Sequence, residues 1–424
     1  MAYYKRYIIM LLCVWVQLMA FAQEADVLAD KGETQLQDEV YASILTCSAG
    51  EDLYAKFGHT ALRVKNWTRG TDVVYNYGCF NYHADNFVWK FLLGETDYRL
   101  EAEDFDCFIY RYRAMGIGVV EQELSLSQSE ANKLEELLEV NLLPENQEYR
   151  YNWLYDNCTE RAKHAVEQAT GGRIVYERME QRSVRKRLRK CLQNSPWACF
   201  GIDMILGEEI DRKPEIWVEK FLPETYREAT GGASINRNKA MTAPTMATLV
   251  LNERQILQPT RVEKRPLWVL SPVCVFSVLL VVAIGLSVYE LRKKRYVWWF
   301  DVILHTVQGL AGVLVAFLFF FSEHAGVDSN WLVVIFNPLA LLYAAWVAWH
   351  RGRGRRTWLA ILNAVVLSAF LVLMMVVDQS FNTAMWLVVA TLWVRAMRKC
   401  MIGSRWRKEA LLYIYNTYIK YVLK

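Results

Sequence analysis

The distribution of apolar side chains divides the chain into two unlike parts. Up to about residue 266 apolar and polar positions are interleaved, as in a soluble domain, whereas the remainder is dominated by Leu, Val, Ala, Trp and Phe. Five of its segments approach the roughly 20 apolar residues that cover a bilayer core, although the last is short. The pattern therefore predicts an all-α bundle of five membrane-spanning helices in residues 267–397: Leu267–Val288, Trp298–Phe321, Trp331–Trp349, Trp358–Val377 and Phe381–Ala396.

Positive charge alternates between the loops that join these segments. Leu291–Tyr296 and His350–Arg356 each hold four Lys or Arg residues, whereas Ser322–Asn330 and Asp378–Thr383 hold none. The tail, residues 398–424, is basic as well, and its apolar residues recur at the spacing of an amphipathic helix. Because cytoplasmic loops carry the excess of Lys and Arg, the basic loops and the tail are predicted to be cytoplasmic.

The N-terminus has the pattern of a secretory signal peptide, predicted as residues 1–22. Lys5 and Arg6 precede the apolar run Ile8–Phe21, and Ala20-Phe21-Ala22 supplies a small-residue cleavage site. A short membrane helix is the alternative, but the apolar run is too short to span comfortably. We therefore expect a multi-pass protein of a bacterial inner membrane, with residues 23–240 folded in the periplasm.

Residues 23–240 are long enough for one substantial core, and their patterning predicts an α+β domain. A capping box, Ser127-x-x-Glu130, opens a helix, and a second helix over Thr159–Thr170 is closed by Gly171-Gly172. Scattered Gly, Thr, Ala and Pro predict a linker over residues 241–266. The predicted strands are Tyr41–Thr46, Thr60–Val64 and Asp72–Tyr77.

The candidate nucleophile is Cys158, within the stretch Tyr155–Arg161. It directly precedes the predicted helix Thr159–Thr170, which either Asp156 or Asn157 can cap. The positive end of a helix dipole and its unpaired N–H groups favour a thiolate, and these groups can also stabilise an oxyanion. The alternative is a small buried hydrophobe, as most free cysteines are. Five more cysteines lie in the exported domain, and their pairing is left open.

Two further residues suit the chemistry of a cysteine nucleophile. His59 begins one predicted strand and can serve as the base that takes the thiol proton and returns it. Asn76 lies on the following strand, where its amide can fix the imidazole tautomer. Taken singly, His59 is also interpretable as an ordinary core or surface residue, and Asn76 as a turn former at a strand end.

The order of these residues resembles a known group of enzymes. A histidine on one strand, a polar residue on the next and Asn-Cys opening a later helix resemble the permuted papain-like group, which includes the lecithin:retinol acyltransferases. The wider motifs, together with the apolar C-terminal half, resemble the Bacteroidota lipoprotein N-acyltransferases (Lnb). Ala49 and Glu160 depart from that pattern, where a proline and a threonine are expected. The motifs are Leu45–Glu51, Phe57–Val64, Asn76–Gly78, Pro144–Asn146, Tyr149–Asn152 and Asp156–Cys158.

This resemblance implies an activity and a catalytic pair. Cys158 and His59 fall on the catalytic positions of the family, and Asn76 is our own assignment. The implied reaction moves an acyl chain from a membrane phospholipid, through a thioester on the cysteine, to the α-amine of a diacylated lipoprotein. A membrane-tethered cysteine peptidase or amidase acting on peptidoglycan, and a non-enzymatic scaffold, are the alternatives. No metal-ligand spacing, phosphate loop or nucleic-acid patch is visible in the sequence, so neither a cofactor nor a nucleic-acid partner is expected.

A lipid substrate places the site at the outer surface of the bilayer. His324, in an outer loop, and Asn337, inside the third apolar segment, are therefore predicted to line a lipid or headgroup site. Asn157 and Arg161, which flank the proposed nucleophile, complete the predicted substrate contacts. The basic run Arg182–Lys190 is interpreted either as a solvated helix face or as a contact for anionic headgroups.

Overall fold

The computed structural model describes residues 39–177, 182–212, 220–237, 246–261, 266–293, 295–350 and 358–401. The predicted signal peptide and the amphipathic part of the tail lie outside these ranges. An antiparallel sheet with the strand order β10-β5-β1-β2-β3-β4-β6 forms the centre of the N-terminal part. The three predicted strands are confirmed as β1, β2 and β3. The strands are β1 (Val40–Cys47), β2 (His59–Asn66), β3 (Thr71–Cys79), β4 (Asp97–Asp104), β5 (Val119–Leu124), β6 (Glu148–Arg150) and β10 (Val250–Leu257).

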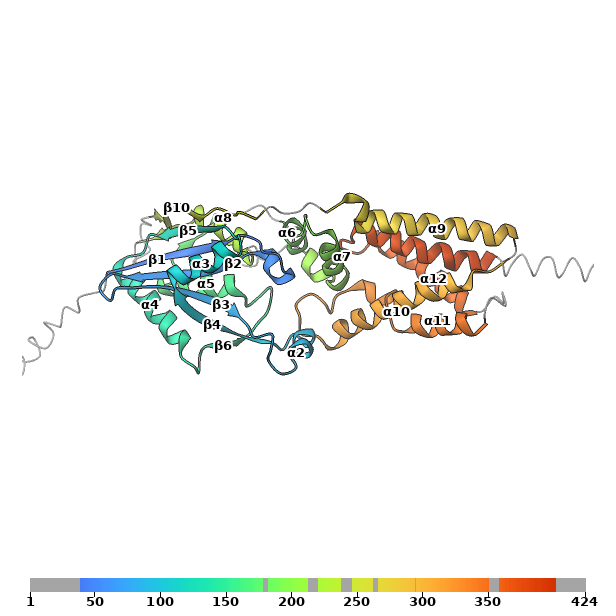
Figure 1. Cartoon of the computed structure of the whole chain (residues 1–424), viewed down its shortest axis with the longest axis horizontal. Helices are drawn as coiled ribbons and strands as arrows, with labels where there is room; N and C mark the ends of the chain where they lie inside the picture. Colours follow the sequence, from blue (N-terminus) through green and yellow to red (C-terminus); the bar gives the residue numbers. More distant parts are fainter. Residues whose placement is uncertain are drawn as a thin grey trace, which may run out of the picture.

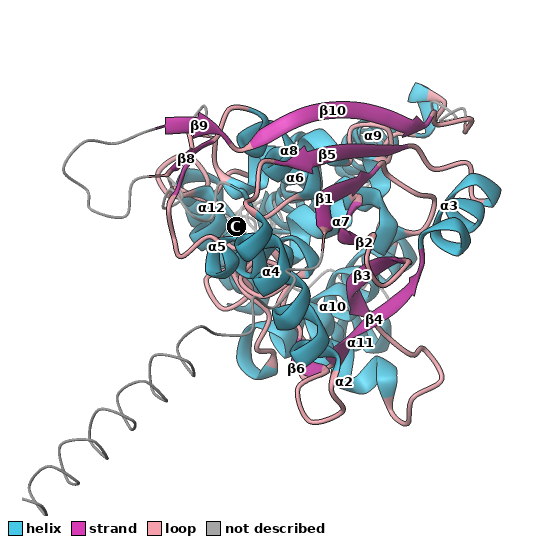
Figure 2. Ribbon diagram, turned by 90° about the vertical axis from the view of Figure 1, so that its left-hand side faces the viewer, coloured by secondary structure: helices cyan, strands magenta, loops and turns pink. Residues whose placement is uncertain are grey.

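Both faces of this sheet are covered by helices. Figure 2 shows α4 (Gln128–Leu142) and α5 (Cys158–Ala169) on one face and α3 (Phe105–Ala114) on the other. Successive strand residues point to opposite faces, so Ile44 packs in the core beneath α4 and α5, whereas Leu45 packs in the core beneath α3. The predicted helix starts are confirmed: α4 begins with the capping box at Ser127, and α5 begins one residue before the predicted start.

The predicted linker contains regular structure. The strands β9 (Met246–Thr248) and β10 lie within residues 241–266, and β10 pairs with β5 as an edge strand of the large sheet. The linker prediction is therefore wrong for this part. Most side chains of β10 are exposed, so the strand lacks the apolar alternation by which a half-buried strand is recognised. The strands β7 (Ile174–Val175), β8 (Ser234–Asn236) and β9 form a separate small sheet.

The C-terminal part consists of apolar helices that lie side by side (Figure 1). Three described segments are long and apolar enough to cross a membrane: α9 (Pro272–Lys293), α10 (Trp298–Phe321) and Trp331–His350. The fourth, α12 (Trp358–Leu373), is a shorter apolar helix. The last predicted segment ended at Ala396, but its helix covers residues 383–401. The last turns of this helix carry charged residues, and the apolar pattern alone therefore predicted too short a segment.

The third predicted segment is not one regular helix. A 3-10 turn at Trp331–Val334, called η5, is followed by an irregular stretch, and α11 (Leu339–His350) begins after Pro338. The irregular backbone packs closely on α10, since a Cβ built at Gly312 would lie 2.4 Å from the backbone nitrogen of Asn337. Irregular backbone at membrane depth is tolerated where protein buries it, and the glycine permits that burial.

Basic residues near the predicted end of the last apolar segment are buried at the end of the bundle. Arg395 is 1% exposed and bonds Glu290 at 2.9 Å and Asp301 at 2.6 Å. Arg398 forms an ion pair with Glu290 as well, at 2.5 Å. These pairs join the last helix to α9 and α10. A charge count along the sequence predicted the side of the membrane but could not reveal that these charges are paired.

Two short helices connect the sheet domain to the bundle (Figure 1). They are α6 (Val184–Cys191) and α7 (Pro196–Ile205), followed by a 3-10 turn, η2 (Glu208–Asp211). Apolar side chains close this junction. Leu188 and Phe221 of the N-terminal part share one buried cluster with Leu318 of α10 and Val327 of an outer loop. The helices α2 (Phe87–Leu93) and α8 (Pro223–Gly231) and the 3-10 turns η1 (Leu53–Phe57) and η4 (Trp268–Leu270) complete the described elements.

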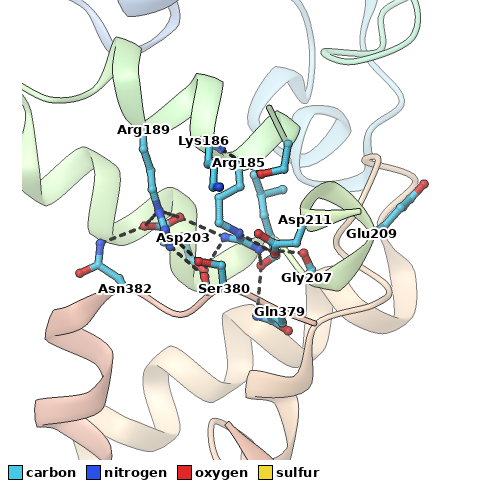
Figure 3. A network of polar contacts seen from close by, with 12 residues as sticks. Arg185, Lys186, Arg189, Asp203, Gly207, Glu209, Asp211, Gln379, Ser380 and Asn382 are labelled. Carbon is cyan, nitrogen blue, oxygen red and sulfur yellow. Dashed lines mark hydrogen bonds and ion pairs between the residues drawn. The ribbon is translucent and has the colours of Figure 1, made fainter. Parts of the chain in front are cut away.

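A polar network fixes the same junction (Figure 3). Arg185, only 1% exposed, donates to Asp203 at 3.0 Å and to Asp211 at 2.8 Å. Arg189 reaches the outer loop by donating to the carbonyl of Ser380 at 2.8 Å. Asn382 donates to Asp203 at 2.9 Å. Neither interpretation of the basic run fits Arg185 and Arg189, because both bind carboxylates of the protein itself.

Candidate active site

The proposed nucleophile is the first residue of α5. Asn157 caps the helix: its Oδ1 accepts the N–H groups of Thr159 at 2.8 Å and Glu160 at 3.0 Å. Of the two residues that the sequence offered as caps, Asn157 is thus the one used. These two N–H groups are occupied by the cap, so an oxyanion at Cys158 needs another donor.

The helix start is tied to the strand that carries the proposed base. Thr60 in β2 and Thr159 in α5 are both fully buried, and their hydroxyl oxygens lie 3.0 Å apart. Each is the chain neighbour of a proposed catalytic residue, Thr60 of His59 and Thr159 of Cys158. This contact brings the histidine on β2 and the cysteine on α5 together across the interface between helix and sheet.

The proposed third residue lies beside His59 on the next strand. Nε2 of His59 is 3.1 Å from Oδ1 of Asn76. The amide nitrogen of Asn76 donates to Glu103 in β4 at 3.0 Å, which assigns Oδ1 as the acceptor toward His59. Nδ1 of His59 is then left for Cys158. The structure therefore brings all three predicted catalytic residues together.

The sequence interpretation missed the residues behind Asn76. Arg111 of α3 bonds the carboxylate of Glu103, so that a polar chain runs from Cys158 through His59 and Asn76 to the far face of the sheet. Neither residue stands in a distinctive motif. Their approach depends on the pairing of β3 with β4 and on the docking of α3, which local sequence does not specify.

The electrostatics favour an ion pair between the cysteine and the histidine. Burial alone disfavours the thiolate, but the charge and hydrogen bond of His59 lower the pKa of Cys158 below its ordinary value. Hydrogen bonds from the Thr60 backbone and the Thr159 side chain act in the same direction. Burial also disfavours the imidazolium, but the charge of Cys158 and the hydrogen bonds with Cys158 and Asn76 raise the pKa of His59 overall.

The other cysteines differ from Cys158 in this respect. The eight cysteines within the described residues are all free thiols. Burial raises the pKa of Cys79 to about 12 and that of Cys199 to about 11, and the pKa values of Cys47 and Cys191 are raised as well. Among the described cysteines with a shifted pKa, only Cys158 is shifted toward the thiolate, the form that a cysteine nucleophile needs.

A buried hydroxyl without a partner adjoins the thiol. Tyr149 of β6 is 7% exposed, and its hydroxyl has no hydrogen-bond partner in the described part of the chain. A Cβ built at Gly78 would lie 3.5 Å from Cβ of Cys158 and 3.8 Å from the Tyr149 hydroxyl oxygen. Both groups therefore border the space that the absent side chain of Gly78 leaves open. Tyr149 belongs to one of the motifs behind the family resemblance, but the sequence assigned it no role.

The two predicted substrate residues beside Cys158 make structural contacts. Besides capping α5, Asn157 donates to the carbonyls of Trp153 at 2.9 Å and Phe221 at 3.1 Å. Arg161 forms two hydrogen bonds of 2.6 Å with Asp156, and its guanidinium lies 4.0 Å from the ring centre of Tyr149. These contacts hold the helix start and the tyrosine. A direct contact with substrate stays a prediction for both residues.

The two predicted lipid-site residues of the C-terminal part are in different places. His324 lies 2.6 Å from the carbonyl oxygen of Phe91 and so joins an outer loop to α2. Asn337 accepts the N–H of Leu339 at 3.1 Å and donates to the carbonyl of Val334 at 2.8 Å, so it stabilises the start of α11. Neither contact tests a lipid-binding role, which stays a prediction.

Fold and site together define a class of protein: an α+β sheet domain with a cysteine–histidine–asparagine site, joined to a bundle of apolar helices. Comparison with known families agrees with this division. The Lnb N-terminal periplasmic domain matches residues 32–188, and the Lnb transmembrane domain matches residues 264–406. The two matches cover well over half of the chain, which therefore belongs to the Lnb family. No curated protein and no solved structure matches it.

Membership supports a role of the lipoprotein N-acyltransferase type, in a membrane protein whose N-terminal domain is periplasmic. The resemblance inferred from the spaced motifs is confirmed at the level of the family.

Proposed function

We propose that the protein is an inner-membrane N-acyltransferase of lipoproteins, in which Cys158 carries the acyl group as a thioester on a permuted papain-like domain. The observation that carries the proposal is the contact of His59 with both Cys158 and Asn76. A thiolate prepared by an imidazolium is the arrangement that a cysteine nucleophile requires.

The first half-reaction acylates the enzyme. The Cys158 thiolate attacks the ester carbonyl of a glycerophospholipid, and the carbon–sulfur bond forms as the carbonyl oxygen becomes an oxyanion. The Tyr149 hydroxyl, which is buried beside the thiol without another partner, donates a hydrogen bond to that oxyanion. When the carbon–oxygen ester bond breaks, His59 gives its proton to the departing lysophospholipid, and an acyl thioester remains on Cys158.

The second half-reaction transfers the acyl group. The neutral α-amine of a diacylated lipoprotein attacks the thioester carbonyl, and His59 accepts the proton that this nitrogen loses. The carbon–sulfur bond then breaks, which yields an amide on the lipoprotein and the free thiolate. Thioesters react readily with amines, which accounts for a cysteine rather than a serine as nucleophile. No step needs a metal or cofactor.

The decisive experiment supplies purified full-length protein with phospholipid and a synthetic diacylated lipopeptide, and follows the products by mass spectrometry. The wild type is expected to yield a triacylated lipopeptide and, without acceptor, a hydroxylamine-sensitive acyl group on Cys158. Cys158→Ala is expected to yield neither, whereas Cys107→Ala, which alters an exposed thiol, should behave as the wild type. Triacylated product from Cys158→Ala would overturn the assignment. Cleavage of peptidoglycan peptides by a wild type that takes up no acyl group would favour the peptidase or amidase instead.

A further inference from the structure

Exposed apolar side chains gather on the part of the sheet domain that meets the bundle. α2 is a short helix none of whose residues is buried, and η1 likewise has no buried residue. Large apolar side chains so exposed are unusual on a soluble surface when they gather in one place. The exposed residues, with solvent-exposed fractions from 44% to 71%, are Leu53, Tyr54, Tyr82, Val88, Trp89 and Phe91.

From this surface, contacting aromatic rings lead inward toward the proposed nucleophile. On α2, the rings of Phe91 and Phe87 lie 6.2 Å apart, and that of Phe87 is 5.7 Å from Phe80 at the end of β3. Phe80 stacks on Tyr98 at 4.8 Å, and Tyr98 stacks on Tyr151 at 4.0 Å.

The inner end of this series adjoins the active site. Gly78, two residues before Phe80, lies against the proposed nucleophile, since a Cβ built there would be 3.5 Å from Cβ of Cys158. At Tyr151, burial and then the electrostatic influence of Cys158 raise the pKa of the hydroxyl. Phe80 and Cys158 pack against the same buried cluster. We call the series Phe91, Phe87, Phe80, Tyr98 and Tyr151, together with Trp89, the aromatic track.

The outer end of the aromatic track meets a membrane helix. The ring of Trp89 is 5.1 Å from Phe317, which lies in the last turns of α10. Beyond it, Phe320 and Phe321 are 68% and 66% exposed. Figure 1 shows α2 beside this end of α10. The track therefore begins beside the end of a helix that is long and apolar enough to cross a membrane.

The attachment of α2 at this point is specific. The carbonyl of Leu93 accepts the N–H of Glu323 at 2.7 Å, and the carbonyl of Phe91 contacts His324 at 2.6 Å. The chain then turns at Gly94 with φ +79°, and a Cβ there would lie 3.0 Å from the backbone nitrogen of His324. Glycine is therefore required for the loop of the bundle to approach this closely.

We infer that the aromatic track binds the acyl chain of the donor phospholipid, and this inference rests on the proposed function. One end of the track lies at a membrane helix and the other beside the thiol that attacks the ester. When the ester of a donor phospholipid reaches Cys158, the first carbons of its acyl chain leave the hydrocarbon of the bilayer. The rings of the track that are not buried, Phe91, Phe87 and Phe80, supply apolar surface that replaces this lost contact. This route also assigns His324 a position: it holds α2 at the entrance.

The inference is tested with full-length protein in nanodiscs, using Trp89→Glu and, as a matched control, Trp67→Glu. Trp67 is equally exposed but follows the end of β2 opposite to His59. Acylation of Cys158 is measured with a long-chain phospholipid and with a short-chain, water-soluble one. The ratio of long-chain to short-chain acylation is expected to fall at least tenfold in Trp89→Glu and to stay unchanged in Trp67→Glu. An unchanged ratio in Trp89→Glu would overturn the inference.

Photocrosslinking separates this inference from the reaction itself. A phospholipid with a diazirine on its acyl chain is expected to label residues 80–93 of Cys158→Ala, where no acyl transfer occurs. Labelling only of the apolar helices, or labelling of 80–93 by a diacylated lipopeptide but not by phospholipid, would overturn the assignment to the donor chain. If residues 80–93 are labelled but the wild-type protein takes up no acyl group, the proposed function would be contradicted, whereas the lipid site would still be supported.

Discussion

His59 opens β2 and Asn76 lies on β3, and their side chains meet with Nε2 of the histidine 3.1 Å from Oδ1 of the asparagine. Because the amide nitrogen of Asn76 donates to Glu103, it is the amide oxygen that faces His59 and accepts a hydrogen bond from Nε2. The other imidazole nitrogen, Nδ1, is then left to face Cys158. In the proposed mechanism the asparagine therefore positions the base and makes no contact with the substrate. Its effect on the reaction passes through the orientation and charge of His59.

Asn76→Ala is expected to lower kcat for acyl transfer on the order of 10- to 100-fold, less than the roughly 10²- to 10⁴-fold expected for His59→Ala. KM for phospholipid should change little, because the lost hydrogen bond orients the base and binds no lipid. The double variant Asn76→Asp with Glu103→Gln keeps an acceptor for His59 and a donor for position 76, and should recover most of the rate. Full turnover by Asn76→Ala would leave Asn76 with a purely structural role.

The pH dependence of Cys158 reactivity follows from the two shifted pKa values. The pKa of Cys158 is lowered below 9.0 mainly by His59 acting against burial, so in the wild type alkylation by iodoacetamide should reach half its maximal rate below pH 9.0. In His59→Ala burial persists without the compensating charge, so the midpoint should move above pH 9.0. The rates are measured by peptide mass spectrometry across pH 5 to 10. Equal midpoints in the two proteins would contradict the ion pair.

Tyr149→Phe is expected to separate activity from stability. Loss of the hydroxyl should lower the acylation rate by roughly 10²- to 10³-fold if it donates to the oxyanion. Since that hydroxyl is buried without a partner, its removal should leave the melting temperature unchanged or raise it. Tyr77→Phe is the control: its hydroxyl accepts from Asn141 at 2.8 Å, so stability should fall while activity is kept. A fall in stability without a fall in rate for Tyr149→Phe would reject the oxyanion role.

The sequence predicted those parts of the fold and site that depend on local pattern. A strand shows as β-branched and aromatic runs, a helix start as a capping residue, and a membrane segment as a long apolar run. Cys158, His59 and Asn76 were found because each occupies such a position, at the start of a helix or on a strand. Family motifs then linked the three.

What could not be predicted depends on contacts between distant segments. The exposed strand β10 looked like a linker because its side chains follow no apolar alternation. The ion pairs of Arg185 and Arg395 could not be predicted, since the carboxylates that pair with them lie 18 residues away at Asp203 and more than 90 away at Asp301. Nothing in the sequence indicated the role proposed for Tyr149, because that proposal depends on a missing hydrogen bond.

Arg185 provides the last prediction, which concerns the junction between the domain and the bundle. Arg185→Ala removes the guanidinium group that donates to the buried carboxylates of Asp203 and Asp211, so their negative charges are less well neutralised. Breaking a buried charge pair by removing one partner costs about 3–5 kcal/mol, so the melting temperature of the full-length protein in detergent should fall steeply. Lys186→Ala, an exposed neighbour on the same helix, should change stability by less than about 0.5 kcal/mol. Arg185→Met should not rescue the protein, since it restores volume but not charge. Equal melting temperatures for the Arg185→Ala and Lys186→Ala proteins would show that the network in Figure 3 does not hold the two parts together.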